Sequence, residues 1–192
     1  TRILSLFCFF ISISVIAQVN TGYQTPKKSL LELIDVDVAP SVLRNSEDKI
    51  MVFLYRSAYK KIEDLSQDEL RLGGLRVDPL RHIGSRITYY NKVEVTKLNE
   101  SKTAQNVIGL PENMKLSNFQ FSPDEKKIAM TNTTQEGVEL WVLDIKTLFA
   151  KKIFEATVNA TMGNAIKWIN NKELIIKALP SELKALINTN TT

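Results

Sequence analysis

The chain has 192 residues, of which 44% are hydrophobic and 24% are charged, and its 25 basic and 21 acidic residues give a net charge of +4. This length and composition are typical of a globular protein with a real core, and they argue against a disordered or fibrous chain. The lysines are scattered along the sequence and form no stripe, so we expect solvated faces and no nucleic acid as a partner.

The first residues form an apolar segment whose only charge is Arg2. Val15 and Ala17 lie three residues and one residue before a possible cut ahead of Gln18, which is the pattern of a secretory signal. We therefore expect residues 1–17 to be a helical signal peptide that is removed on export, to a bacterial periplasm or to the medium. The apolar run is shorter than the ~20 residues of a membrane span, so we expect no stable membrane anchor after cleavage. A buried core strand is the alternative.

Residues that could bind a metal or act as nucleophiles are scarce. Cys8 is the only cysteine and lies within the predicted signal, where Leu6 and Phe7 precede it in place of the small residues of a lipoprotein signal. His82 is the only histidine, and we expect it in a polar surface loop without a catalytic role. A transition-metal site would need more such ligands, and no phosphate-binding loop occurs. We therefore assign no catalytic, cofactor-binding or metal-binding residue and no cofactor to this chain.

A pattern of strand, polar corner and strand occurs three times, in residues 41–56, 116–133 and 165–180. In the second copy, the corner Ser122-Pro123-Asp124 has the chemistry of a tight turn, because proline fixes φ and the flanking side chains bond to nearby backbone groups. The second and third copies are 46 residues apart, measured from Ile128 to Leu174. A recurring unit of about 40 to 50 residues is typical of propeller blades.

The middle copy extends into four expected strands, at residues 116–122, 127–133, 137–145 and 151–155. The third of them is apolar on both faces, since Val138, Leu140 and Val142 alternate with Trp141, Leu143 and Ile145. A strand with one face in water would alternate apolar with polar residues, so we expect both faces of this strand to be covered. A blade between two neighbouring blades has that environment; a core strand of a β-sandwich is the alternative.

The first copy contains an insertion between its second and third strands. Ser66 and Glu69 have the spacing of a capping box, and Gly73 and Gly74 follow, so we expect a helix over residues 66–72 that ends at the glycines. Two further strands are expected, a long one over residues 87–99 and an outer one over residues 105–110. A brief helix over residues 29–33 precedes the first copy.

Together these features predict an all-β fold, a partial β-propeller of about two and a half four-stranded blades, preceded by a signal helix and with a short inserted helix. The expected segments are a signal peptide (1–17), a lead-in (18–40), blade one with its helical insertion (41–110), blade two (111–160) and the truncated start of blade three (161–192). Because a closed propeller has at least four blades, we expect the chain to be the front piece of a longer protein.

Three stretches of the repeated part, FSPDEKKIAMTN (121–132), GVELWVLDI (137–145) and WINNKELIIKALP (168–180), resemble the propeller of the prolyl oligopeptidase family of serine peptidases. The stretches YQTPKKSLLELIDVDVAPSV, YKKIEDLSQDELRLGGLRVDP and SRITYYN are similar to its glutamyl-endopeptidase-like branch, found in bacterial envelopes and plastids. The resemblance extends over about residues 23–180.

This resemblance implies an exported serine peptidase that hydrolyses peptide bonds, with a preference for glutamate at the cleavage site. In such enzymes a catalytic α/β-hydrolase domain follows the propeller, and its nucleophile lies in a G-x-S-x-G elbow. No such elbow occurs in this sequence. We therefore expect the catalytic residues outside the chain, the propeller to restrict entry to peptides, and the partners to be peptide substrates and the protein's own C-terminal hydrolase domain. The alternative is a non-enzymatic envelope propeller that binds a protein or a polymer.

Overall fold

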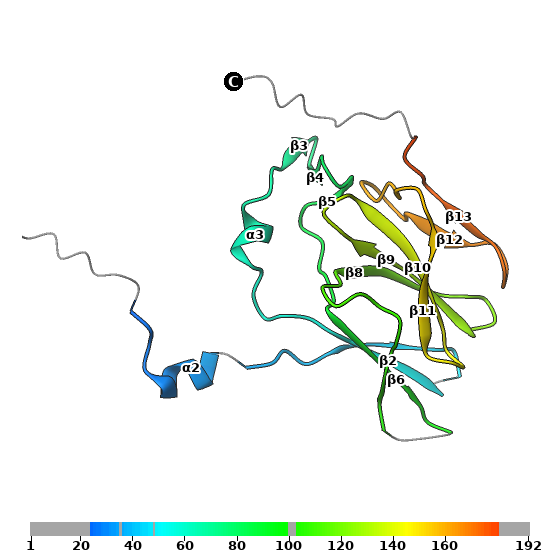
Figure 1. Cartoon of the computed structure of the whole chain (residues 1–192), viewed down its shortest axis with the longest axis horizontal. Coiled ribbons are helices and arrows are strands. Elements are labelled where there is room, and N and C mark those ends of the chain that lie inside the picture. The colour runs from blue at the N-terminus through cyan, green and yellow to red at the C-terminus, as the bar shows by residue number, and fades with distance from the viewer. Residues whose placement is uncertain (1–23, 35, 48, 100–102, 181–192) are drawn as a thin grey trace, which may run out of the picture. The chain divides into compact units, whose positions relative to one another are not determined.

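The computed structural model describes residues 24–34, 36–47, 49–99 and 103–180 (Figure 1). The predicted signal peptide and residues 181–192 lie outside the described residues. The chain divides into two units, Thr1–Val36 and Asp37–Thr192, which we describe separately. In the first unit, helix α2 (Lys28–Ile34) confirms the helix expected over residues 29–33, and none of its residues is buried.

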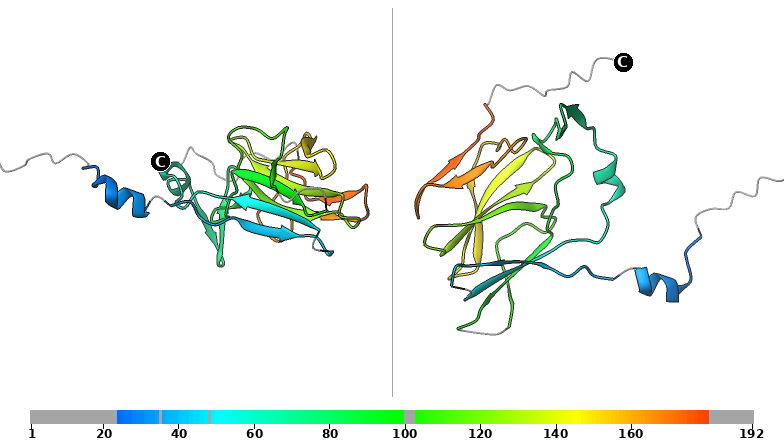
Figure 2. Two further views of the ribbon diagram at one scale, coloured as in Figure 1. Left: turned by 90° about the horizontal axis from the view of Figure 1, so that it is seen from below. Right: turned by 180° about the vertical axis from the view of Figure 1, so that it is seen from behind.

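The second unit contains two four-stranded antiparallel sheets and a two-stranded one (Figures 1 and 2). In the first sheet the order is β1 (Ser41–Arg44), β2 (Ile50–Tyr55), β6 (Lys92–Lys97) and β7 (Gln105–Asn106). In the second it is β8 (Leu116–Phe121), β9 (Lys127–Thr133), β10 (Val138–Asp144) and β11 (Phe149–Phe154). Strands β12 (Ile166–Trp168) and β13 (Leu174–Ile176) form the third sheet. Each sheet is a meander in chain order, and the fold is the predicted partial β-propeller.

Each of the three polar corners closes a hairpin at the first pair of strands in its sheet. Between β8 and β9, the Ser122 hydroxyl donates to Asp124 Oδ1 (2.7 Å) and accepts from the Lys127 amide (3.0 Å). In the first sheet, Asn45 Oδ1 accepts from the amides of Lys49 and Ile50, at 2.8 and 2.9 Å. These side chains replace water as partners of the turn backbone, so the predicted corner chemistry is confirmed.

Strand β10 has a hydrophobic cluster on each of its two faces. On one face, Leu143 and Ile145 pack with Ile128 and Met130 of the same sheet and with residues of the first sheet, among them Val52 and Val95. On the opposite face, Val138, Leu140 and Val142 pack with residues of the third sheet, among them Ile166 and Trp168. The second sheet is therefore covered on both faces by its neighbours, as the doubly apolar pattern of this strand predicted. Trp141 itself is only partly buried.

Residues 56–91, which we call the insertion, connect β2 to β6. They contain a single helical turn, α3 (Ile62–Leu65), and a three-stranded antiparallel sheet of β3 (Leu70–Leu72), β4 (Leu75–Asp78) and β5 (Ile83–Gly84). The insertion therefore forms a small sheet of its own, set beside the blade sheets (Figure 1).

The helix predicted over residues 66–72 is wrong. Gly73 and Gly74 have φ values of 54° and 92° and form the two-residue turn of the β3–β4 hairpin; two consecutive left-handed residues suit this turn, and only glycine adopts them without cost. Ser66 follows α3 and donates its amide to the Ile62 carbonyl, so it ends a helix and does not begin one. The strand expected over residues 87–99 is also shorter, because only Lys92–Lys97 pair with β2.

Candidate functional site

The insertion lies against the end of the second sheet where β9 turns into β10. In a meander this end is opposite the β8–β9 and β10–β11 turns. Lys115, just before β8, donates to Asp64 of the insertion at 2.6 Å, and Gln135 in the β9–β10 turn donates to Glu63 at 3.0 Å. The chain connectivity of blade one thus places its extra residues over blade two.

The ion pair of Asp78 and Arg81 anchors the insertion to this end. Asp78 Oδ1 accepts from the amides of Leu80 and Arg81, both at 3.0 Å, and its Oδ2 accepts from the Arg81 guanidinium at 2.8 Å. Arg81 also donates to the Thr134 carbonyl (3.1 Å) and to Gln67 (2.8 Å). Both charged side chains are about nine-tenths buried. Because a buried charge without partners costs several kcal/mol, the stability of the fold depends on this complete set of hydrogen bonds.

Strand β5 carries the insertion into the core of the blades. Ile83 is fully buried in the cluster of Val138, Leu140 and Val158, and it forms a parallel bridge with Ala160, beyond β11. The carbonyl of the preceding His82 accepts from the Ala160 amide at 2.8 Å. Through these contacts one segment of blade one packs against both blade two and the start of the third sheet.

The surface position predicted for His82 is wrong. His82 is 7% exposed and has a φ of 55°. It lies in the turn between β4 and β5, where its backbone N–H donates to the Asp78 carbonyl. The sequence around it reads as a polar loop, but the next residue, Ile83, bridges to Ala160 in the segment between β11 and β12, and the His82 carbonyl accepts from the Ala160 amide. Within the described residues, no hydrogen bond joins the imidazole to another side chain, and no nucleophile and base are brought together there.

A cluster of three arginines around one glutamate occupies one face of the insertion sheet. Arg71 and Arg76 are directly opposite each other on β3 and β4. Glu69 Oε1 accepts from both, at 3.0 and 2.6 Å, and its Oε2 accepts from the Ser85 hydroxyl at 2.6 Å and lies 3.5 Å from Arg86 Nε. The hydrogen bond from Ser85, together with those from Arg76 and Arg71, outweighs burial and lowers the pKa of Glu69 to about 2.

A partly buried carboxylate, Glu139, lies on β10. Burial raises the pKa of Glu139, but hydrogen bonds from Trp141 (2.8 Å), Asn132 (3.1 Å) and Lys152 (3.1 Å) together lower it below its ordinary value. An ionised carboxylate whose acceptor sites are filled by three donors of its own sheet is poorly suited to proton transfer. Glu139 therefore orders the face of the sheet on which Trp141 lies.

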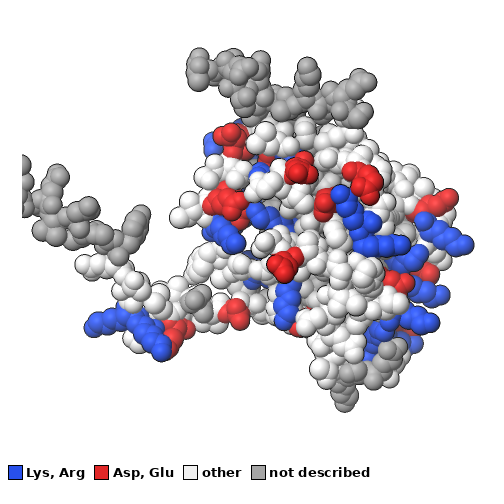
Figure 3. Space-filling model, in the orientation of Figure 1, with Lys and Arg blue, Asp and Glu red and all other residues white. Residues whose placement is uncertain are grey.

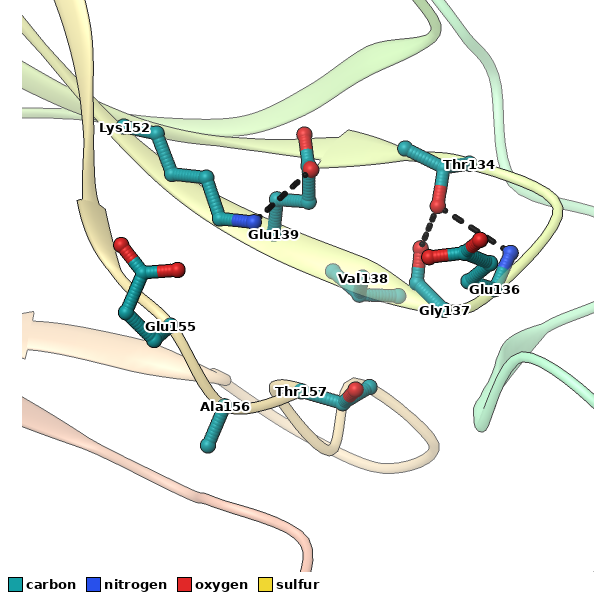
Figure 4. Close-up of a pocket in the computed structure, with 9 residues that line it drawn as sticks. All are labelled: Thr134, Glu136, Gly137, Val138, Glu139, Lys152, Glu155, Ala156 and Thr157. Atoms are coloured by element: carbon teal, nitrogen blue, oxygen red, sulfur yellow. Dashed lines mark hydrogen bonds and ion pairs between the residues drawn. The ribbon is translucent and has the colours of Figure 1, made fainter.

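A shallow pocket of about 70 Å³ opens beside Glu139 at the insertion end of the second sheet (Figure 4). It is lined by Thr134, Glu136, Gly137, Val138, Glu139, Lys152, Glu155, Ala156 and Thr157. Its rim is tied by the Thr134 hydroxyl, which donates to the Gly137 carbonyl at 3.1 Å. Ligand pockets usually enclose about 300 Å³ or more, so this hollow is too small for a peptide.

Other kinds of site are not found in the part of the chain that the structure describes. No group of three or more His, Cys, Asp and Glu side chains there could hold a metal ion. None of the described helices is long and apolar enough to span a membrane. On the face shown in Figure 3, basic and acidic side chains are interspersed. The arginine cluster is therefore the most distinctive concentration of charge that the described hydrogen bonds and ion pairs define.

This cluster was not predicted from the sequence. The run Leu70-Arg71-Leu72-Gly73-Gly74-Leu75-Arg76 reads almost the same in both directions around the two glycines. A glycine pair between two alternating segments is a hairpin signal, and a two-residue turn places residues at equal distance from it opposite each other. The signal for the Arg71–Arg76 pair was thus present in the sequence, beside the capping-box spacing of Ser66 and Glu69, which predicted a helix.

The two meandering sheets and the half-built third one define a partial β-propeller, and comparisons with known proteins indicate which propellers it is similar to. No family model matches the chain. Two plant proteins, each named "Probable glutamyl endopeptidase, chloroplastic", are 27% identical over 172 residues (Oryza sativa subsp. japonica) and 25% identical over 174 residues (Arabidopsis thaliana). The alignments include 83% and 85% of this chain. They confirm the resemblance to the glutamyl-endopeptidase-like branch of the prolyl oligopeptidase family.

The chain spans 18% of the length of these two relatives. Among solved structures, the acylaminoacyl peptidase of Pyrococcus horikoshii aligns with 71% of this chain and 16% of its own, at 20% identity and a TM-score of 0.37. This structural likeness is too weak to support a conclusion.

Proposed function

We propose that this chain is the N-terminal propeller part of an exported serine peptidase of the prolyl oligopeptidase type. The observation that supports the proposal is the similarity to two glutamyl endopeptidases along more than four-fifths of the chain, in a chain that folds into propeller blades. The catalytic α/β-hydrolase domain would follow these blades in the whole protein, because the described residues bring no nucleophile and base together. Its chemistry would be acyl transfer to a serine with a histidine base.

In this proposal the propeller restricts access to the catalytic domain, so that peptides enter and folded proteins do not. The anchoring of the insertion supports such a role, since a barrier needs loops held in place: Asp78, Arg81 and Ile83 fix residues 56–91 against the sheets. Residues 1–17 would direct export and be removed, so the mature protein should begin at or near Gln18 when sequenced from its native host. Material that begins at Thr1 or upstream would contradict the export proposal.

The activity is tested by hydrolysis in the full-length protein. We expect a peptide with an internal glutamate to be cleaved after it, and the matched peptide with glutamine at that position to be cleaved much more slowly. Cleavage of both peptides at the same rate would contradict the glutamate preference, but the proposal that the protein is a peptidase would still hold. Absence of cleavage of any peptide would favour a propeller that only binds its partner.

A further inference from the structure

We propose that the arginine cluster of the insertion, Arg71, Arg76 and Arg86 around Glu69, binds carboxylate groups of acidic peptide chains. The inference deepens the proposed function, on which the choice of a peptide as ligand depends. The residues themselves are identified by geometry and charge.

The first argument is an excess of charge that the fold does not need. Like charges directly opposite each other on neighbouring strands destabilise a sheet, yet Arg71 and Arg76 are such a pair, and Arg86 adds a third positive charge 3.5 Å from the same carboxylate. One glutamate leaves the cluster with two uncompensated positive charges. A sheet built only for stability would place a neutral or acidic residue at one of these positions.

The second argument is the supply of unused donors. A guanidinium has five N–H groups, and Glu69 is the only acceptor that the described part of the chain offers to these three. Arg71 and Arg86 are well exposed, at 73% and 66% of their side-chain surface. Their free N–H groups suit a carboxylate, which guanidinium binds with two parallel hydrogen bonds.

The third argument is that the cluster is held in place before any ligand arrives. Ser85 continues the row of Arg71 and Arg76 across the sheet, because its backbone N–H donates a hydrogen bond to the Arg76 carbonyl at 2.9 Å, and its hydroxyl donates to Glu69. On the opposite face of β4 from Arg76, Val77 is buried. Rigid support of this kind reduces the conformational entropy that the binding site loses when a ligand binds.

The test is equilibrium binding to the full-length protein, followed by fluorescence anisotropy. The probe is fluorescein-labelled hexaglutamate made of D-residues, which a peptidase does not cleave, and the reference probe is the matching hexaglutamine. We expect hexaglutamate to bind and hexaglutamine not to bind. The double variant Arg71→Gln/Arg86→Gln should weaken hexaglutamate binding at least about fivefold, a modest factor because both arginines are exposed.

Two variants control for net charge and for folding. The double variant Arg56→Gln/Lys60→Gln removes two exposed charges at the start of the insertion, outside the cluster, and should leave binding unchanged. Arg71→Lys keeps the charge but loses the forked donor, so its loss should be smaller than that of Arg71→Gln. Far-UV circular dichroism of each variant should match the wild type.

Three results would overturn the inference: no binding of hexaglutamate, an equal loss in Arg56→Gln/Lys60→Gln, or tighter binding of inorganic polyphosphate that is lost in Arg71→Gln/Arg86→Gln. The last would assign the cluster to phosphate ligands. Because binding is measured without hydrolysis, the two proposals can fail separately. If the protein hydrolyses peptides but binding does not depend on the cluster, only the inference about the cluster fails. If hexaglutamate binds to the cluster but no peptide is hydrolysed, only the proposed peptidase function fails.

Discussion

Ile83 is the residue whose truncation should most directly release the insertion from the blades. Its side chain is fully buried among residues of the second sheet and of the segment before the third. Ile83→Ala removes three carbons, which at about 0.8 kcal/mol each amounts to ~2.4 kcal/mol of transfer free energy. The cavity left behind adds to this, so we expect a loss of about 3 kcal/mol.

The effect should be measured by amide hydrogen exchange, because it is local. Exchange from the native state reports the free energy of local opening, and about 3 kcal/mol corresponds to exchange ~100-fold faster. The affected amides should be those of Ser85 and Ala160, whose hydrogen bonds hold the insertion sheet together and join it to the segment between β11 and β12. The control is Ile62→Ala, the same change in the same insertion at a residue that is 84% exposed, which should alter exchange little. Equal effects of the two substitutions would refute the account of how the insertion is anchored.

Three further predictions concern charged and polar residues of the insertion. Arg81→Met leaves the buried Asp78 without its partner and should lower the free energy of unfolding by about 3–5 kcal/mol. The double variant Asp78→Asn/Arg81→Met should lose clearly less, because no unpaired charge remains. Equal losses of the two variants in thermal unfolding would contradict the pairing. The pKa of Glu69 is lowered from 4.5 to about 2, so the unfolded state binds more protons than the folded state between pH 2 and pH 4.5. The stability that Glu69 contributes is therefore present above pH 4.5 and is lost as the pH falls toward 2. The difference in exchange of β3–β5 between wild type and Glu69→Gln should therefore shrink over this pH range, and a constant difference would count against the charge network. His82→Ala should destabilise the fold more than His82→Asn, because asparagine tolerates the positive φ better; turnover per folded molecule should stay unchanged in both, and a loss of turnover without a loss of stability would give His82 a role in catalysis.

Local chemistry in the sequence was enough to predict the repeating hairpins. The corner of Ser122 and Asp124 is made by side chains that bond to backbone within five residues, so nothing distant is needed to form it. The doubly apolar alternation of β10 likewise contained the information that two neighbours cover it, because each face of a strand is set by residues two apart.

The insertion could not be predicted in the same way because its environment is set by residues far away in the sequence. His82 lies in a polar stretch, yet it is buried where the next residue, Ile83, bridges to Ala160, far along the chain. Ser66 and Glu69 match a helix start in spacing, but Glu69 finds better partners in Arg76 and Ser85, 7 and 16 residues on, and the glycine pair favours a hairpin. Of the candidate site, the Arg71–Arg76 pair was signalled by the glycine pair, whereas the contacts of Ser85 and Arg86 with Glu69 come from residues just after a later strand and have no local signal.

The most direct test of the proposed function is to locate the nucleophile. The full-length protein and a polypeptide ending at Thr192 are treated with a fluorophosphonate probe, and the labelled residue is identified by mass spectrometry. The proposal predicts that the full-length protein is labelled on a serine outside residues 1–192, within a G-x-S-x-G motif, and that the polypeptide ending at Thr192 is not labelled. Labelling of any residue within 1–192, or no labelling of the full-length protein, would contradict it.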